Sequence, residues 1–179
     1  GREVWMFEGA PLPNVGLNAV VGRVPEEYGL DPLAFDQMRP GCFDIHERIR
    51  DMNANGVLGS LNFPSMTGFT GQLFMTMDDK DVALELLRAY NDWHLEDWCG
   101  TYPGRMIPLA VPPVWDPQAM ADEVRRMAER GCHAVTFSEN PEKLRPPSWH
   151  SDHWDPFLAA GAETAPVICP HIGPSSTTA

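Results

Sequence analysis

The chain has 179 residues, of which 43% are hydrophobic and 21% charged, and its formal net charge at pH 7 is −12. This length and composition suffice for one domain with a sizeable core, and no apolar stretch approaches the roughly 20 residues needed to cross a bilayer. The 13 lysines and arginines are spread along the chain, which argues against a nucleic-acid-binding surface. We therefore expect a small-molecule substrate, with no nucleic acid or membrane as partner.

Residues 1–42 are rich in proline and glycine. Five prolines and six glycines interrupt this stretch, so no regular pattern of apolar residues develops. We predict a long excursion or insertion here, with at most a short hairpin around Trp5 and Val20-Val21. Residues 43–173 form the predicted domain, and residues 174–179 form a polar tail.

From residue 43 onward, the spacing of the apolar residues is that of a helix in some segments and that of a strand in others. Residues 43–53 predict a helix, Asn55-Gly56 a turn, and residues 57–63 a short strand. Residues 80–98 predict a long helix. Its expected inward side carries Val82, Leu86, Leu87, Tyr90 and Trp93.

The same alternation continues to the end of the domain. Residues 106–111 predict a strand, and Asp116-Pro117 opens a helix that Gly131 ends. Residues 133–137 predict the next strand. A second Asp-Pro pair, at 155 and 156, opens a helix that leads to a strand ending at His171. This order predicts a parallel α/β sheet with helical crossovers.

His171 is the first candidate functional residue, because it closes the apolar run 167–173 (VICPHIG). Parallel α/β enzymes keep their chemistry where buried strands end. A histidine there can bind a metal, act as a general base or donate a hydrogen bond. A purely structural histidine at the end of a strand remains an alternative.

Three further polar residues follow predicted strands. Glu139 lies two residues beyond Phe137, at the same edge as His171, and either supports a ligand or faces the substrate. Asn62 and Ser65 follow the first strand, and with the loop 67–71 (TGFTG) they could line the mouth of a substrate pocket. The alternative for Glu139 is a solvated acid in a loop. The alternative for the residues after the first strand is an ordinary turn.

Histidine and cysteine spacing leaves other readings open. His150 and His153 have the HxxH spacing, and with Cys169 or His171 they could form a structural zinc site. The four cysteines stand far apart without a CxxC pair, which is typical of reduced thiols in a cytoplasmic protein.

Residues 48–173 resemble the amidohydrolase-related branch of the amidohydrolase superfamily, which includes aminocarboxymuconate-semialdehyde decarboxylase. The matching pieces are 49–57 (IRDMNANGV), 90–93 (YNDW), 103–110 (PGRMIPLA), 116–117 (DP), 122–127 (DEVRRM), 131–135 (GCHAV), 154–157 (WDPF) and 170–173 (PHIG). The resemblance implies a distorted (β/α)8 TIM barrel with a divalent metal at the carboxyl ends of its strands. The metal would be zinc or, alternatively, manganese.

Within that resemblance, the chain would supply about four parallel strands, the second to the fifth, and His171 would match the metal ligand of the fifth. The family's His-x-His pair on the first strand and its aspartate on the eighth have no counterpart here. A complete barrel takes about 250 residues. We therefore expect a partial barrel from a metal-dependent hydrolase or nonoxidative decarboxylase acting on a small carboxylated or cyclic metabolite. We also expect the fragment to be inactive and able to form homo-oligomers.

The rival hypothesis is a noncatalytic parallel α/β module of flavodoxin-like outline, which would bind a ligand without metal.

Overall fold

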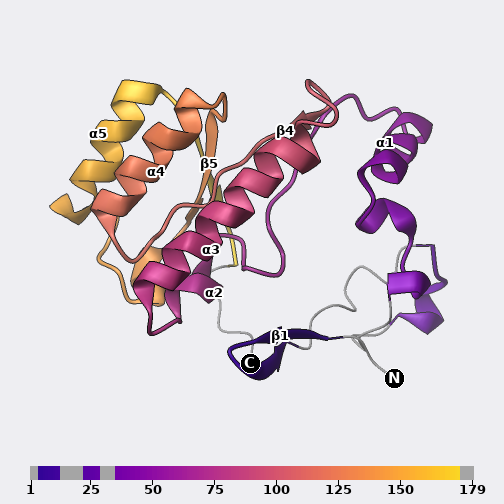
Figure 1. The fold of residues 1–179 in the computed structure, drawn as a ribbon, viewed down its shortest axis with the longest axis horizontal. Coiled ribbons are helices and arrows are strands. Elements are labelled where there is room, and N and C mark those ends of the chain that lie inside the picture. The colour runs from indigo at the N-terminus through magenta and orange to yellow at the C-terminus, as the bar shows by residue number, and fades with distance from the viewer. Residues whose placement is uncertain (1–3, 13–21, 29–34, 174–179) are drawn as a thin grey trace. The chain divides into compact units, whose positions relative to one another are not determined.

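The computed structural model describes residues 4–12, 22–28 and 35–173 (Figure 1). The chain divides into two compact units, Gly1–Leu58 and Gly59–Ala179. The predicted domain boundary after residue 42 stays a prediction, and the predicted tail, 174–179, lies outside the described residues. Among the helices that are described, none is both long and apolar enough to span a membrane.

The first unit contains a hairpin and one helix of several turns. Strands β1 (Trp5–Phe7) and β2 (Ala10–Leu12) pair antiparallel, whereas Val20 and Val21 lie outside the described residues. Helix α1 (Ile45–Ala54) begins where the Asp44 carboxylate accepts hydrogen bonds from two backbone N–H groups. Among the residues that the structure describes, short 3₁₀ turns precede it at Pro25–Glu27, Phe35–Gln37 and Pro40–Cys42.

The second unit is built on parallel strands, as the sequence predicts. Strand β3 (Ser60–Leu61) pairs with β4 (Met106–Ile107), and β5 (Ala134–Ser138) pairs with β6 (Val167–His171), in both cases parallel. An isolated parallel bridge between Ala110 and Val135 connects the two pairs. These short parallel pairs are compatible with a segment of a TIM barrel.

Two strands are much shorter than the predicted ranges 57–63 and 106–111. Prolines explain this difference, because a proline has no N–H to donate to a ladder. Pro64 follows β3 closely, and Pro108 interrupts β4 before its chain pairs again at Ala110.

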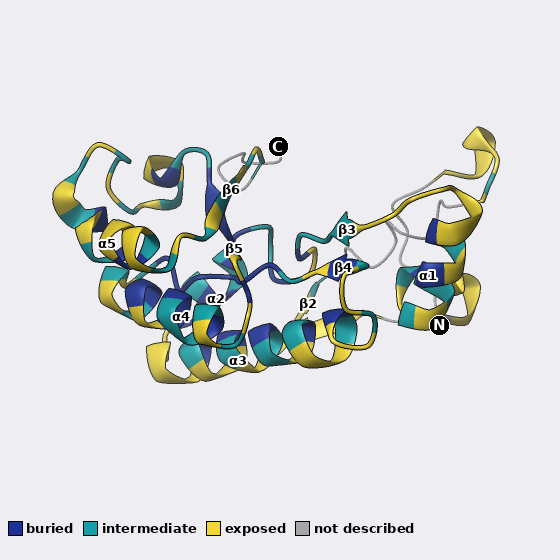
Figure 2. Ribbon diagram, turned by 90° about the horizontal axis from the view of Figure 1, so that it is seen from above, coloured by how far each residue is buried: buried dark blue, intermediate teal, exposed yellow. Residues whose placement is uncertain are grey.

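Helices cover one face of these strands (Figure 2). They are α2 (Gln72–Met75), α3 (Lys80–Trp93), α4 (Pro117–Glu129) and α5 (Asp155–Thr164), with a π-helix (His94–Cys99) directly after α3 and 3₁₀ turns at Pro141–Leu144 and Asp152–Trp154. The Asp116 carboxylate caps α4 with Pro117 at its first position, as predicted. Asp79 caps α3 in the same manner.

The largest core cluster lies between β5, α4 and α5. Phe137 is fully buried and contacts Trp154 edge to face and Phe157 in a stacked arrangement, with ring centroids 5.0 and 5.4 Å apart. Val135 on the same strand and Ile168 on β6 pack against this cluster. Alternate residues of β5 and β6 therefore point toward the opposite face.

The predicted inward side of the long helix is correct only in part. Leu87 is buried as predicted and Tyr90 is half-buried. Val82, Leu86 and Trp93 are each more than 40% exposed, so the prediction is wrong for these three. Ala83 and Asn91, which were not predicted to face inward, are buried. The buried amide of Asn91 bonds the backbone of Val111, and this polar contact sets the rotation of α3. A hydrophobicity pattern cannot anticipate that outcome, because it places asparagine on the outside.

Candidate functional site

The carboxyl ends of the strands gather several of the predicted polar residues. Ser138 is paired directly with His171 in the parallel ladder, so Glu139 and the residues after His171 leave the sheet at the same edge. The loop that follows β3 reaches this edge as well, because Thr136 Oγ1 on β5 donates to the carbonyl of Phe69 at 2.7 Å. Residues from three strand ends therefore meet there.

The His171 ring is half-buried between two phenylalanines. Phe69 stacks on it with ring centroids 4.0 Å apart and an interplanar angle of 19°. Phe63 meets it edge to face at 4.5 Å. These two contacts limit the rotation of the imidazole and cover part of its surface.

The polar contact of the His171 ring favours one tautomer. Nδ1 lies 2.5 Å from the carbonyl oxygen of Ile172. A carbonyl can only accept, so Nδ1 carries the proton, and in the neutral ring Nε2 keeps its lone pair. This is the arrangement found in metal-binding histidines, which donate their second N–H to a carbonyl or carboxylate.

Both carboxylate oxygens of Glu139 are engaged at the same edge. Oε1 accepts from the Gly173 N–H and Oε2 from the Ser138 hydroxyl, each at 3.2 Å. The Ser138 hydroxyl oxygen in turn accepts from the Asn140 N–H at 3.2 Å. Glu139 thus connects the end of β5 to the turn that follows His171.

Asn62 and Ser65 lie in the same loop region with different surroundings. Asn62 is half-buried, and its Oδ1 accepts from Trp98 Nε1 at 3.4 Å. Ser65 is exposed, and its carbonyl accepts from the Gly68 N–H at 3.2 Å. The substrate-facing roles of both residues stay predictions.

Phe63 was missed in the sequence analysis, and Phe69 was placed there in a loop at the substrate mouth without its contact with His171. Phe63 follows β3 by two residues, beyond the end of the strand at Leu61. The loop is fixed near Phe69 by Gly71, where an added Cβ would lie 2.5 Å from Val111 Cγ1. Two aromatic residues in a loop directly after a strand were the available signal.

Metal donors do not form a complete set here. Across residues 4–12, 22–28 and 35–173, no three His, Cys, Asp or Glu side chains lie close enough to hold one ion. His150 is exposed, and His153 meets the Trp154 ring edge to face at 4.7 Å. The HxxH alternative therefore lacks a third ligand among the described residues, and His171 is a single donor.

A buried histidine and cysteine lie in the π-helix. Cys99 Sγ is 3.8 Å from His94 Nε2, and both residues are at most 3% exposed. Burial lowers the pKa of His94 to about 4 and raises the pKa of the Cys99 thiol to about 12. Both side chains are therefore neutral at pH 7, unlike a catalytic thiolate–imidazolium pair. The four cysteines, which all lie among the described residues, form no disulfide.

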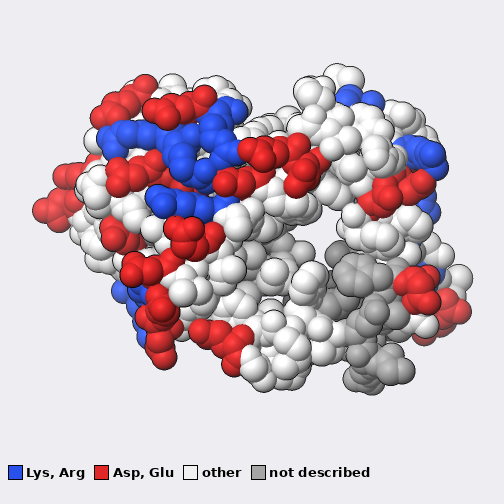
Figure 3. Space-filling model, in the orientation of Figure 1, with Lys and Arg blue, Asp and Glu red and all other residues white. Residues whose placement is uncertain are grey.

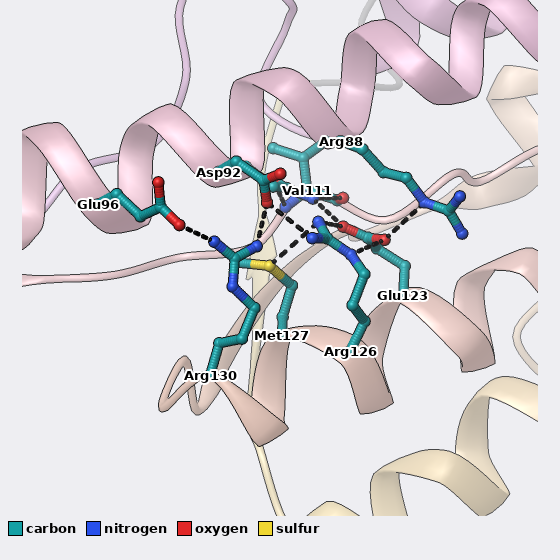
Figure 4. A network of polar contacts seen from close by, with 9 residues as sticks. Arg88, Asp92, Glu96, Val111, Glu123, Arg126, Met127 and Arg130 are labelled. Atoms are coloured by element: carbon teal, nitrogen blue, oxygen red, sulfur yellow. Dashed lines mark hydrogen bonds and ion pairs between the residues drawn. The ribbon is translucent and has the colours of Figure 1, made fainter.

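The densest polar network joins α3 to α4 (Figure 4). Glu123 is 1% exposed and accepts from Asn91 Nδ2 at 2.7 Å, from Arg126 at 2.7 and 2.9 Å, and from Arg88 at 3.2 Å. The Asn91 amide also donates to the Val111 carbonyl at 2.9 Å and accepts from its N–H at 2.8 Å. The network therefore fixes the chain beyond β4.

Charge balance explains how Glu123 remains ionised while buried. Burial alone would raise its pKa, but hydrogen bonds from Arg126, Asn91 and Arg88 outweigh this effect and lower the pKa. Arg126 and Arg130 both bind Asp92, and Arg130 also binds Glu96. In Figure 3, lysine and arginine side chains lie interleaved with aspartate and glutamate side chains over the region of α3, α4 and α5. We read this network as a structural element.

A comparison with known families finds a match over most of the chain. The family model described as Amidohydrolase matches residues 10–179. No curated protein matches the chain.

Proposed function

The chain belongs to the amidohydrolase family, and from this premise we propose that it forms part of the active site of a metal-dependent hydrolase or nonoxidative decarboxylase. Family membership supports a hydrolase-type enzyme. The finer proposal rests chiefly on one observation, the position of His171 at the end of β6 with Nε2 bearing its lone pair. Its substrate would be a small carboxylated or cyclic metabolite.

His171 would bind a divalent ion, zinc or alternatively manganese, through Nε2. Such an ion, when bound, supplies an activated water or polarises a substrate oxygen. The described residues lack the three protein ligands that a catalytic zinc site usually has, so the other ligands would come from outside them. Phe63 and Phe69 would keep the imidazole oriented and exclude water from its faces.

The natural full-length protein offers a direct test with a matched pair of histidines. His133 is exposed and immediately precedes β5, at the amino end of the strand. We expect His171→Ala to lower metal content and turnover of lactones or carboxylated aromatics by at least about tenfold. We expect His133→Ala to change neither measurement appreciably.

Equal metal loss in two folded variants would refute the role of His171. A metal-free protein that binds a small ligand without turnover would refute the enzyme proposal and favour the binding module.

A further inference from the structure

One peptide group at the strand edge lies between a carboxylate and an imidazole. The N–H of Gly173 donates to Glu139 Oε1 at 3.2 Å, and the carbonyl of Ile172 accepts from His171 Nδ1–H at 2.5 Å. These two groups belong to the same peptide bond. We propose that Glu139 is a positioning residue, which acts through the Ile172–Gly173 peptide to hold His171 with its proton on Nδ1.

The physical basis is the polarisation of an amide by a charge. A carboxylate that accepts from the N–H increases the negative charge on the oxygen of that amide, and hydrogen bonds in series strengthen one another. The Ile172 oxygen thereby becomes a better acceptor for Nδ1–H. Glu139 can thus influence the imidazole without touching it.

Glu139 is itself held in place from β5. The Ser138 hydroxyl donates to its second oxygen at 3.2 Å, and the Ser138 carbonyl accepts from Trp149 Nε1 at 3.1 Å. Ser138 is buried and is the ladder partner of His171. The chain of hydrogen bonds therefore starts on a strand fixed by the core and ends at the ring.

Gly173 gives the peptide its orientation. Its φ is +117°, a region that residues with a side chain rarely adopt, although an added Cβ would meet only ordinary contacts with the Phe69 ring at 3.7 Å. Gly173→Ala should therefore disturb the peptide through backbone strain without a steric clash. This variant tests the bridge independently of Glu139.

The use of Nε2 as a ligand rests on the proposed function, but the tautomer does not. Long-range ¹H–¹⁵N correlation spectra of the ¹⁵N-labelled 179-residue chain report which ring nitrogen of His171 carries the proton, at a pH where the ring is neutral. We expect Nδ1–H in the unmodified chain. Glu139→Ala should shift the tautomer ratio roughly tenfold toward Nε2–H, because a charged acceptor is lost.

Two further variants complete the series. Glu139→Gln retains an acceptor oxygen and should give an intermediate ratio, whereas Glu142→Ala, an exposed acid in the following 3₁₀ turn, should give none of the shift. Gly173→Ala should shift the ratio in the same direction as Glu139→Ala. Circular dichroism identifies any variant that has not folded. If Glu139→Ala fails to fold, the tautomer ratio of Glu139→Gln tests the proposal in its place.

A proton on Nε2 in the unmodified chain would overturn the proposal, as would an unchanged ratio in folded Glu139→Ala. Absence of turnover in the natural full-length protein, together with the expected tautomers, would count against the proposed function alone. Loss of turnover when Glu139→Ala is made in the full-length protein, with an unchanged tautomer, would count against the positioning role alone.

Discussion

Two carboxylates in the second unit, Glu123 and Glu139, differ in the groups that they bind. Glu123 lies between two helices and binds two arginines and an amide. Glu139 lies where strands end and binds a hydroxyl and a backbone N–H. The first is neutralised by permanent charges, and the second reaches a peptide that contacts His171.

This difference teaches how to separate a structural acid from a positioning acid. Removing Glu123 leaves cationic and amide groups without their partner, so the whole unit should lose stability. Removing Glu139 should change a local geometry at one histidine. Burial alone would have suggested Glu123 as the functional acid, because it is the more buried of the two.

The largest expected effect comes from Glu123→Ala. Breaking a buried ion pair by removing one partner costs about 4 kcal/mol, because the remaining charges stay uncompensated. Urea unfolding should show this loss in the free energy of unfolding, while the His171 tautomer stays the same. A loss below about 1 kcal/mol would contradict a structural role for the network.

The next effect is a pH dependence due to His94. Its pKa is about 4 in the folded chain because of burial, against 6.5 for an ordinary histidine. Below pH 6.5 the unfolded chain therefore binds a proton that the folded chain refuses, and stability falls as the pH drops toward 4. The linked loss reaches about 3 kcal/mol at pH 4.

The variant His94→Leu isolates this contribution. Urea unfolding at several pH values between 7 and 4 should give a shallower decline for His94→Leu than for the unmodified chain. His46→Ala, which removes an exposed histidine of the first unit, serves as control. Parallel declines in all three proteins would show that His94 is accessible to protons.

Phe69→Leu should have a smaller and more local effect. Losing the stacked pair with His171 costs about 1 kcal/mol, and the ring protons of His171 should shift in NMR spectra as the aromatic neighbour disappears. Tyr28→Leu, which replaces an exposed aromatic residue, should change neither quantity. Unchanged His171 signals in Phe69→Leu would show that the loop does not cover the ring in solution.

The smallest effect is expected from Glu163→Gln. Glu163 pairs with Arg125 across α4 and α5 at 2.7 Å, but its side chain is 56% exposed. Exposed pairs contribute less than about 1 kcal/mol. Urea unfolding should therefore place this variant close to the unmodified chain, in contrast to Glu123→Ala, and a comparable loss in both would remove the distinction between buried and exposed pairs.

Local signals in the sequence predicted much of the second unit. The Asp116-Pro117 cap and the short strand β5 depend on neighbouring residues, so both were visible in the sequence. The alternation of strands and helices along the sequence predicted that the strands pair in parallel, and the structure confirms this pairing. The rotation of α3 depended on a long-range bond from Asn91 to Val111, which no periodicity encodes.

The site was predictable in position but only partly in composition. His171 and Glu139 could be assigned to one edge because parallel strands end together. The aromatic contacts of His171 come from a loop whose path is fixed by Thr136 and Gly71, and this path is not a local property. The peptide bridge depends on the orientation of a single amide at Gly173.

The π-helix at His94–Cys99 has a consequence for evolutionary comparison. A π-turn accommodates one residue more than the α-helical hydrogen-bond spacing allows. Deleting one residue there would convert the π-turn into an α-helical turn and leave the side chains after it in their present orientation, because the π-turn absorbs the extra residue locally. We therefore expect alignments of related sequences to show a one-residue gap at this place without loss of the helix that surrounds it.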